Sequence, residues 1–128
     1  MRQQLANQYL ADKVATATPA QLTGMLYDGA VGALRSAVHM QEGGQWQEAV
    51  PRVLKAQRIV LELRESLNHE VSGDLAANLW QLYTWCYACL LRCTGEREVE
   101  VTKEALSVLS ELADAWKEGV LGVAPVSA

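Results

Sequence analysis

The stretch that decides the fold is TATPAQLTGMLYDGA, residues 16–30, because it fixes where the first long helix begins. Thr18 is a favoured N-cap residue, and Pro19 suits the first helical position. Gln21 follows Thr18 by three residues, so the two can form a capping box. Apolar residues then recur at intervals of three and four until a glycine pair ends the pattern. The spacing predicts a helix over residues 19–42.

The apolar stripe of this helix is slim. Gly29, Ala33 and Ala37 lie on the same side as larger leucines. Small residues let a neighbouring helix approach closely, and they also leave a furrow that another chain could occupy. Both interpretations stay open from the sequence.

Three more amphipathic patterns follow along the chain. They predict helices over about residues 47–67, 73–93 and 98–118. Pro51 is the one obstacle, because a proline inside a helix removes a hydrogen bond and clashes with the preceding turn. We therefore expect the regular part of that helix to begin close to Pro51.

Four helices with short connections favour antiparallel neighbours. We therefore expect an all-α fold, an antiparallel up-down-up-down four-helix bundle that forms one domain over residues 1–128. The small-residue tail, VLGVAPVSA at residues 120–128, is expected to be loose.

Composition narrows the classes of function. The chain has 128 residues, half of them apolar, which suits one domain with its own core. Its net charge of −4 is spread in mixed sign without a basic run, so nucleic acid is not an expected partner. The sequence lacks a membrane-spanning apolar run and a secretory signal, so we expect a cytoplasmic protein without membrane insertion.

No chemistry-bearing motif stands out. Cys86, Cys89 and Cys93 lie close together on one side of a helix and are expected to be free, buried thiols. His39 and His69 are the only histidines and form no Glu-x-x-His pair, so neither a metal nor a cofactor is predicted. No phosphate loop or nucleophile with a histidine and an acid partner is present, so we expect no enzymatic activity.

The helix expected over residues 73–93 carries more apolar surface than one core face can use. Its core face is predicted to hold Leu79, Leu82, Tyr83, Cys86 and Leu90. Trp80, Tyr87 and Leu91 form a second stripe, about 100° around the helix. Trp80 and Tyr87 fit either burial in a central helix or an exposed binding surface, and the pattern does not choose.

The preceding helix has apolar residues outside its main stripe as well. Leu54 and Leu61 are seven residues apart, on one side of that helix. If the two helices are antiparallel neighbours, these leucines and the second stripe form the floor of one groove. Such a groove suits an amphipathic helix or an extended segment of a partner.

Short motifs spread along most of the chain are MLYDG (residues 25–29), LRESLN (63–68), GDLAANL (73–79) and ADAWKE (113–118). Tyr9 and Lys13-Val14 precede them. Together these residues resemble the FliS family of flagellar export chaperones. The resemblance implies a helical bundle that wraps the C-terminal segment of flagellin across apolar grooves. It also implies that the chaperone prevents premature polymerisation and passes its client to the flagellar type III export gate.

The resemblance further implies a mobile N-terminal segment, about residues 1–17, that lies over part of the groove when the client is absent. Tyr9 is then a regulatory residue, although it could also be an ordinary packing tyrosine. The residues expected to contact a partner are Tyr9, Val14, Tyr27, Asp28, Leu54, Leu61, Trp80, Tyr83, Tyr87 and Leu91.

A second hypothesis comes from the surplus apolar surface itself. The chain could be a homodimeric regulatory or adaptor bundle that has no flagellin client. The same surface would also allow weak self-association in a chaperone. In either case apolar burial drives binding, so affinity is expected to change little with salt.

Overall fold

The computed structural model describes residues 2–119, apart from the side chains of residues 71 and 72. This range forms five helices: α1 (Arg2–Thr16), α2 (Pro19–Glu42), α3 (Trp46–Glu65), α4 (His69–Glu96) and α5 (Val99–Lys117). The prediction of an all-α fold is confirmed for these residues. The tail that was expected to be loose lies outside the described residues.

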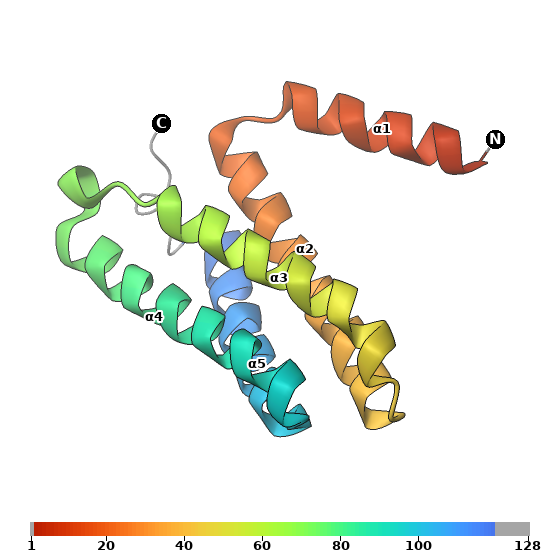
Figure 1. Ribbon diagram of the computed structural model, residues 1–128. Coiled ribbons are helices and arrows are strands. Elements are labelled where there is room, and N and C mark those ends of the chain that lie inside the picture. Colours follow the sequence, from red (N-terminus) through yellow and green to blue (C-terminus); the bar gives the residue numbers. More distant parts are fainter. Residues whose placement is uncertain (1, 120–128) are drawn as a thin grey trace.

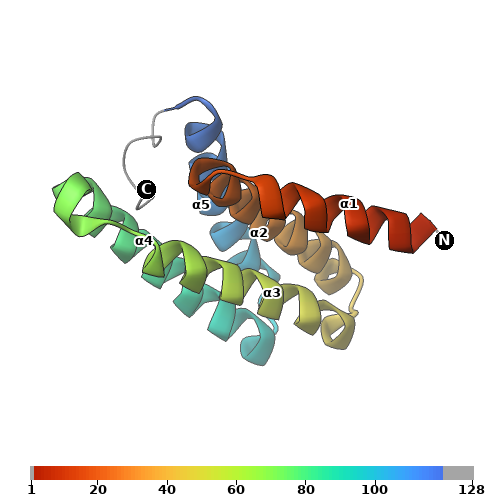
Figure 2. The ribbon, with the colours of Figure 1, turned by 90° about the horizontal axis from the view of Figure 1, so that it is seen from above.

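Four of the helices surround one core (Figure 1). α2 packs against α3 and α5, and α4 also packs against α3 and α5, so the four form a closed ring. α1 lies outside this ring (Figure 1), and none of its residues is buried. In the view from above, α1 overlaps α2 (Figure 2). The prediction of four helices was therefore incomplete, because the described residues form a fifth helix, α1, outside the ring.

The position of α1 follows from its sequence. Its larger apolar residues are Leu5, Tyr9, Leu10 and Val14. They spread over about half of the helix circumference instead of forming one stripe, so α1 has no single face to bury against the ring. The N-terminal segment is thus a helix whose side chains are all exposed.

The start of α2 matches the prediction. The Gln21 backbone N–H donates to Thr18 Oγ1 at 3.1 Å, and the Thr18 N–H donates to Gln21 Oε1 at 2.9 Å. Further along α2, Ala30 and Ala37 are fully buried, with Ala33 close behind. Close helix packing is therefore the correct interpretation of the alanines.

Pro51 lies inside α3 and does not mark its beginning. The helix starts at Trp46, one residue before the predicted start at 47, and its regular part begins earlier than expected, before Pro51. Pro51 and Gln47 are both exposed. The Gln47 carbonyl, which loses its helical donor at position 51, can therefore bond to water.

α4 differs from its prediction at both ends. The turn expected before residue 73 is a short helical piece, and the helix breaks at Gly73, where φ is +49°. Glycine tolerates this left-handed conformation because it has no Cβ. At the other end α4 continues to Glu96, and Arg97 turns the chain with φ +53°.

The core is one continuous cluster inside the ring. From α4 it takes Leu79, Tyr83, Cys86 and Leu90, as predicted. Leu82 was expected there but is 38% exposed, at the edge of the buried face of α4. The three cysteines are buried and unpaired, which confirms the prediction of free thiols.

Candidate partner-binding surface

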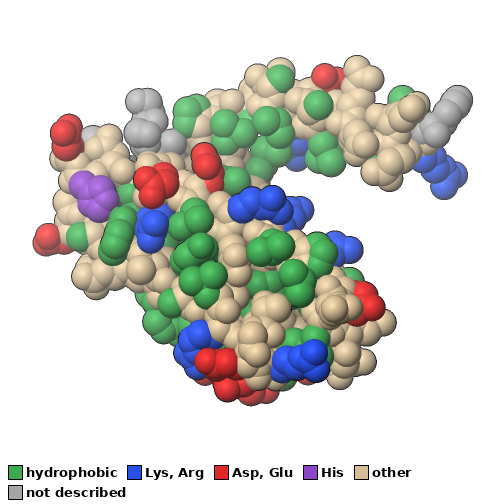
Figure 3. All heavy atoms as spheres, viewed as in Figure 1, with side chains coloured by type: hydrophobic (Ala, Val, Ile, Leu, Met, Phe, Trp, Pro, Cys, Tyr) green, Lys and Arg blue, Asp and Glu red, His purple; other side chains and the backbone are tan. Residues whose placement is uncertain are grey.

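Exposed and half-buried apolar side chains gather where α3 packs on α4. We call this line the α3/α4 seam and define it by Leu54, Leu61, Trp80, Tyr87 and Leu91. Leu54, Leu61 and Tyr87 line one hollow together with Gln57 and Arg58. Leu54, Trp80 and Leu91 are 45%, 41% and 54% exposed. Figure 3 shows apolar side chains along α3 and beside it, with Lys and Arg side chains among them. The structure thus brings together the two helix faces that the sequence predicted to share a groove.

Polar contacts fix the shape of the seam. Gln57 Nε2 on α3 donates to the Leu90 carbonyl oxygen on α4 at 3.1 Å. Arg64 Nη1 donates to Thr84 Oγ1 at 3.2 Å, and its guanidinium carbon lies 5.1 Å from the centre of a Trp80 ring. A cation held over an indole is attracted by the negative ring face. These contacts join α3 to α4 and hold Trp80 in place before any partner arrives.

A second apolar hollow lies on the other flank of α3, and we call it the α2/α3 groove. Its volume is about 470 Å³, and it is lined by Val14, Leu22, Met25, Leu26, Gly29, Lys55, Ile59 and Glu62. A Cβ on Gly29 would lie 3.2 Å from Ile59 Cδ1, so the missing side chain leaves room here. Gly29 thus both admits Ile59 at close range and lines the groove. Val14 is the α1 residue that forms part of the groove wall.

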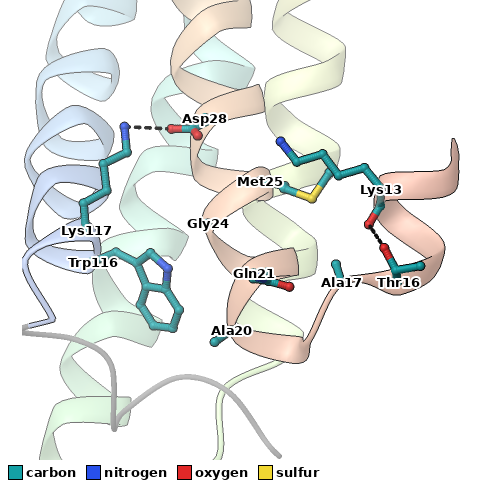
Figure 4. Close-up of a pocket in the computed structure, with 10 residues that line it drawn as sticks. All are labelled: Lys13, Thr16, Ala17, Ala20, Gln21, Gly24, Met25, Asp28, Trp116 and Lys117. Carbon is teal, nitrogen blue, oxygen red and sulfur yellow. Dashed lines mark hydrogen bonds and ion pairs between the residues drawn. The ribbon is translucent and has the colours of Figure 1, made fainter. Parts of the chain in front are cut away.

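A third hollow, of about 560 Å³, lies where the end of α1 meets α2 and α5 (Figure 4). A Cβ on Gly24 would lie 3.2 Å from Trp116 Nε1, so the glycine leaves the indole edge open to this pocket. Asp28 Oδ1 lies 3.1 Å from Lys117 Nζ at the rim. The partner of Asp28 within this chain is thus an α5 lysine, and the pair is exposed.

Two residues predicted to contact a partner are instead in the core. Tyr27 is 1% exposed and Tyr83 is fully buried, and their hydroxyl groups hydrogen-bond to each other. Burial in the apolar core raises the pKa of both phenols. Neither side chain can touch a partner in this conformation, because each fills the space between the helices.

Tyr9 has the opposite environment. It is 66% exposed on α1, which buries none of its residues. An ordinary packing role for Tyr9 therefore does not fit the structure. Tyr9 lines neither the seam hollow nor the α2/α3 groove.

Several surface residues were missed by the sequence patterns. Met25 and Ile59 line the α2/α3 groove, and Arg64 fixes the seam. The glycines that flank Met25, at positions 24 and 29, were the available signal for a hollow beside α2. No signal pointed to Arg64, because its contact with Trp80 depends on the packing of two helices.

The side chains and helix lengths of residues 2–119 bear on two further features, metal sites and membrane spans. No group of three or more His, Cys, Asp or Glu side chains there is arranged to hold a metal ion. Within the same part of the chain, every helix is too short or too polar to span a bilayer.

Comparison with known proteins agrees with this architecture. The flagellar secretion chaperone FliS of Bacillus subtilis is 30% identical over 88% of this chain and 83% of its own. The Escherichia coli protein of the same name is 34% identical over 84% of this chain and 80% of its own. A crystal structure of a bacterial flagellar chaperone superimposes with a TM-score of 0.71 at 23% identity, over 95% of this chain and 99% of that one. The family model for the flagellar protein FliS matches residues 1–122, and the chain therefore belongs to the FliS family.

Proposed function

We propose that this protein is a cytoplasmic export chaperone that binds the C-terminal segment of flagellin. In this proposal it prevents premature polymerisation of its client and delivers it to the flagellar type III export gate. Family membership and the flagellar secretion chaperones among its relatives support the proposal. The observation that carries it is the α3/α4 seam, where Leu54, Trp80 and Leu91 are exposed and Leu61 and Tyr87 line a hollow.

The two flanks of α3 suit a client that wraps. We take α2 to α5 as an antiparallel four-helix body, with the seam on one side of α3 and the α2/α3 groove on the other. A segment that crosses α3 can bury apolar side chains in both. A disordered client loses about 2–5 kcal/mol in ordering, which burial in two hollows can offset better than burial in one.

The proposed activity is binding without catalysis. The groups whose pKa is shifted by burial are phenols and thiols facing the core, and none of them lies in the seam hollow or the groove. Perturbed ionisable groups at an active site normally line a cleft that substrate can enter. The apolar lining of the seam and groove instead favours recognition of a polypeptide.

Calorimetric titration tests the proposal directly. The purified chain is titrated with a peptide covering the C-terminal segment of the flagellin encoded by the same genome. We expect saturable one-to-one binding with a negative heat-capacity change, because apolar surface is removed from water. No binding to a chain that is folded by circular dichroism would overturn the proposal.

Variants locate the binding surface. Leu61→Asp and Tyr87→Asp place a charge in the seam hollow and should each weaken binding at least tenfold, about 1.4 kcal/mol, with helix content unchanged. Leu5→Asp is the matched control, because Leu5 is 70% exposed on α1 and lines neither the seam nor the groove. Unchanged affinity in both seam variants would mean that the client binds elsewhere.

The alternative function is a homodimeric adaptor that buries the seam against a second copy. The exposure of Leu54, Trp80 and Leu91 is the observation that keeps this hypothesis open. Sedimentation of the isolated chain separates the two functions. A stable dimer that Leu61→Asp converts to a monomer, together with no flagellin binding, would favour the adaptor.

A further inference from the structure

Two arginines, Arg58 and Arg64, lie at the α3/α4 seam of a chain whose overall charge is negative. Arg58 lines its hollow and forms no ion pair with any described residue. Arg64 lies over Trp80, and the one carboxylate paired with it is that of Glu65, at 3.7 Å. The chain has a net charge of −4, so two arginines beside an apolar surface are a local departure from the overall charge.

The neighbouring charged groups do not cancel this pair. Glu62, on α3, lines the α2/α3 groove on the other flank of the helix. Near the other end of the seam, the Glu96 carboxylate on α4 pairs with Arg92 at 3.6 Å. Its negative charge is therefore balanced by a cation of the same helix. Glu65 is mostly exposed, and its 3.7 Å contact with Arg64 is a weak surface pair.

We propose that the segment held in the α3/α4 seam is an amphipathic helix whose apolar stripe is bordered by carboxylates, and that Arg58 and Arg64 recognise those carboxylates. The inference rests on the proposed function and adds the chemistry of the client. The seam residues of α3, from Leu54 to Arg64, cover ten helical steps, about 15 Å at 1.5 Å per residue. Such a length matches a partner helix of about three turns, and the two arginines lie about 9 Å apart along it.

The two arginines have different parts in this recognition. Arg58 is exposed, so it acts mainly on the approach of an acidic segment and raises the association rate. Arg64 has a side chain that is 22% exposed and is already oriented by Thr84 and the Trp80 ring. A guanidinium has five N–H donors, and the contacts to Thr84 and Glu65 leave donors for a bidentate carboxylate. Arg64 therefore acts mainly on the dissociation rate.

The test compares two peptides on matched variants. One peptide is the C-terminal segment of flagellin from the same genome, and the other has each Asp and Glu replaced by Asn and Gln. Both are titrated into the natural chain, Arg58→Gln, Arg64→Gln and Arg64→Lys. Arg52→Gln is the control, because Arg52 is an exposed arginine of α3 that lines neither the seam hollow nor the groove.

We expect Arg58→Gln to weaken binding of the acidic peptide about threefold and Arg64→Gln about tenfold, while Arg52→Gln changes it little. Neither seam variant should affect the neutral peptide, which should bind the natural chain more weakly. Arg64→Lys should restore only part of the affinity, because an ammonium cannot make the planar two-bond contact. Added salt should slow association of the acidic peptide with the natural chain more than with Arg58→Gln.

Two results would overturn the inference while leaving the proposed function intact. One is equal affinity of the natural chain for both peptides. The other is an equal loss for both peptides in the arginine variants. Failure of both peptides to bind the natural chain would overturn both the proposed function and the inference. Arg58→Gln keeps the test valid if Arg64→Gln unfolds, because Arg58 makes no ion pair with a described residue.

Discussion

The hydroxyl groups of Tyr27 and Tyr83 hydrogen-bond to each other in the centre of the core. Tyr27 belongs to α2 and Tyr83 to α4, which face each other across the ring, since each packs mainly on α3 and α5. Each hydroxyl is the other's partner, so two polar groups are satisfied where water does not reach. The pair therefore links two helices that have little other contact.

Removing one of the two hydroxyl groups should lower the free energy of unfolding by more than half of what removing both would. Tyr27→Phe or Tyr83→Phe leaves one buried hydroxyl without its partner and should lower the free energy of unfolding by about 1–3 kcal/mol. The double variant removes both groups and should lose less than the sum of the two single changes. Urea denaturation of the four proteins measures this cycle, and additive losses would show that the hydrogen bond contributes nothing.

Stability should fall in alkali. Burial raises the pKa of Cys86 to about 12 from an ordinary value of 9.0, and it also raises the pKa of Tyr27 and Tyr83. Above about pH 9 the unfolded chain releases protons that the folded chain retains, so the free energy of unfolding declines as pH rises. Below about pH 9 these thiol and phenol groups are protonated in both states, so they should not change the free energy of unfolding. Urea midpoints measured at about pH 8 and about pH 10 check the sign, and an unchanged midpoint would contradict it.

The same burial should protect the cysteines from chemical labelling. Thiolates are the reactive form, and the raised pKa of the Cys86 and Cys89 thiols disfavours it. A thiol reagent at about pH 8 should modify the folded protein slowly and all three cysteines rapidly in urea. Rapid labelling of the folded chain would mean that α4 opens readily.

Replacing Pro51 should stabilise the protein. Pro51→Ala restores an N–H donor inside α3 and should raise the free energy of unfolding by about 1–3 kcal/mol. Pro19→Ala is the control, because Pro19 occupies the start of α2, where its N–H would have no helical acceptor. Thermal unfolding of both variants measures the difference, and equal effects would contradict the assignment of a lost bond to Pro51.

Filling the α2/α3 groove should reduce client binding. Gly29→Leu would occupy the space beside Ile59 and should weaken the flagellin peptide about fivefold or more. Gly32→Leu is the control on the same helix, because nothing lies within 4 Å of its added Cβ and it does not line the groove. Equal affinity of the two variants would remove the groove from the binding surface.

The sequence predicted best those features that depend on local spacing. The capping box at Thr18 and the shared groove of Leu61 and Tyr87 follow from short patterns and are present. The burial of Tyr83 was predicted from its place on the core face of α4, but that of Tyr27 was not, because its hydroxyl has its partner 56 residues away. Without that partner in view, a tyrosine beside small residues looks like a surface contact.

The helix boundaries near Pro51 and Arg97 differ from the prediction because of the local surroundings of these residues. Pro51 is tolerated because it faces water, and Arg97 takes a left-handed conformation usually left to glycine. The helix propensity of a residue type is an average over many proteins, and the surroundings of one particular residue can outweigh it. The position of α1 was missed because its apolar residues do not form a stripe that tells where it packs.

Because none of the α1 residues is buried, this helix contributes little to the free energy that holds the ring together. Its amino acids are thus nearly free of the constraints that folding places on the other four helices. Selection can alter Leu5, Tyr9 and Leu10 without destabilising the core.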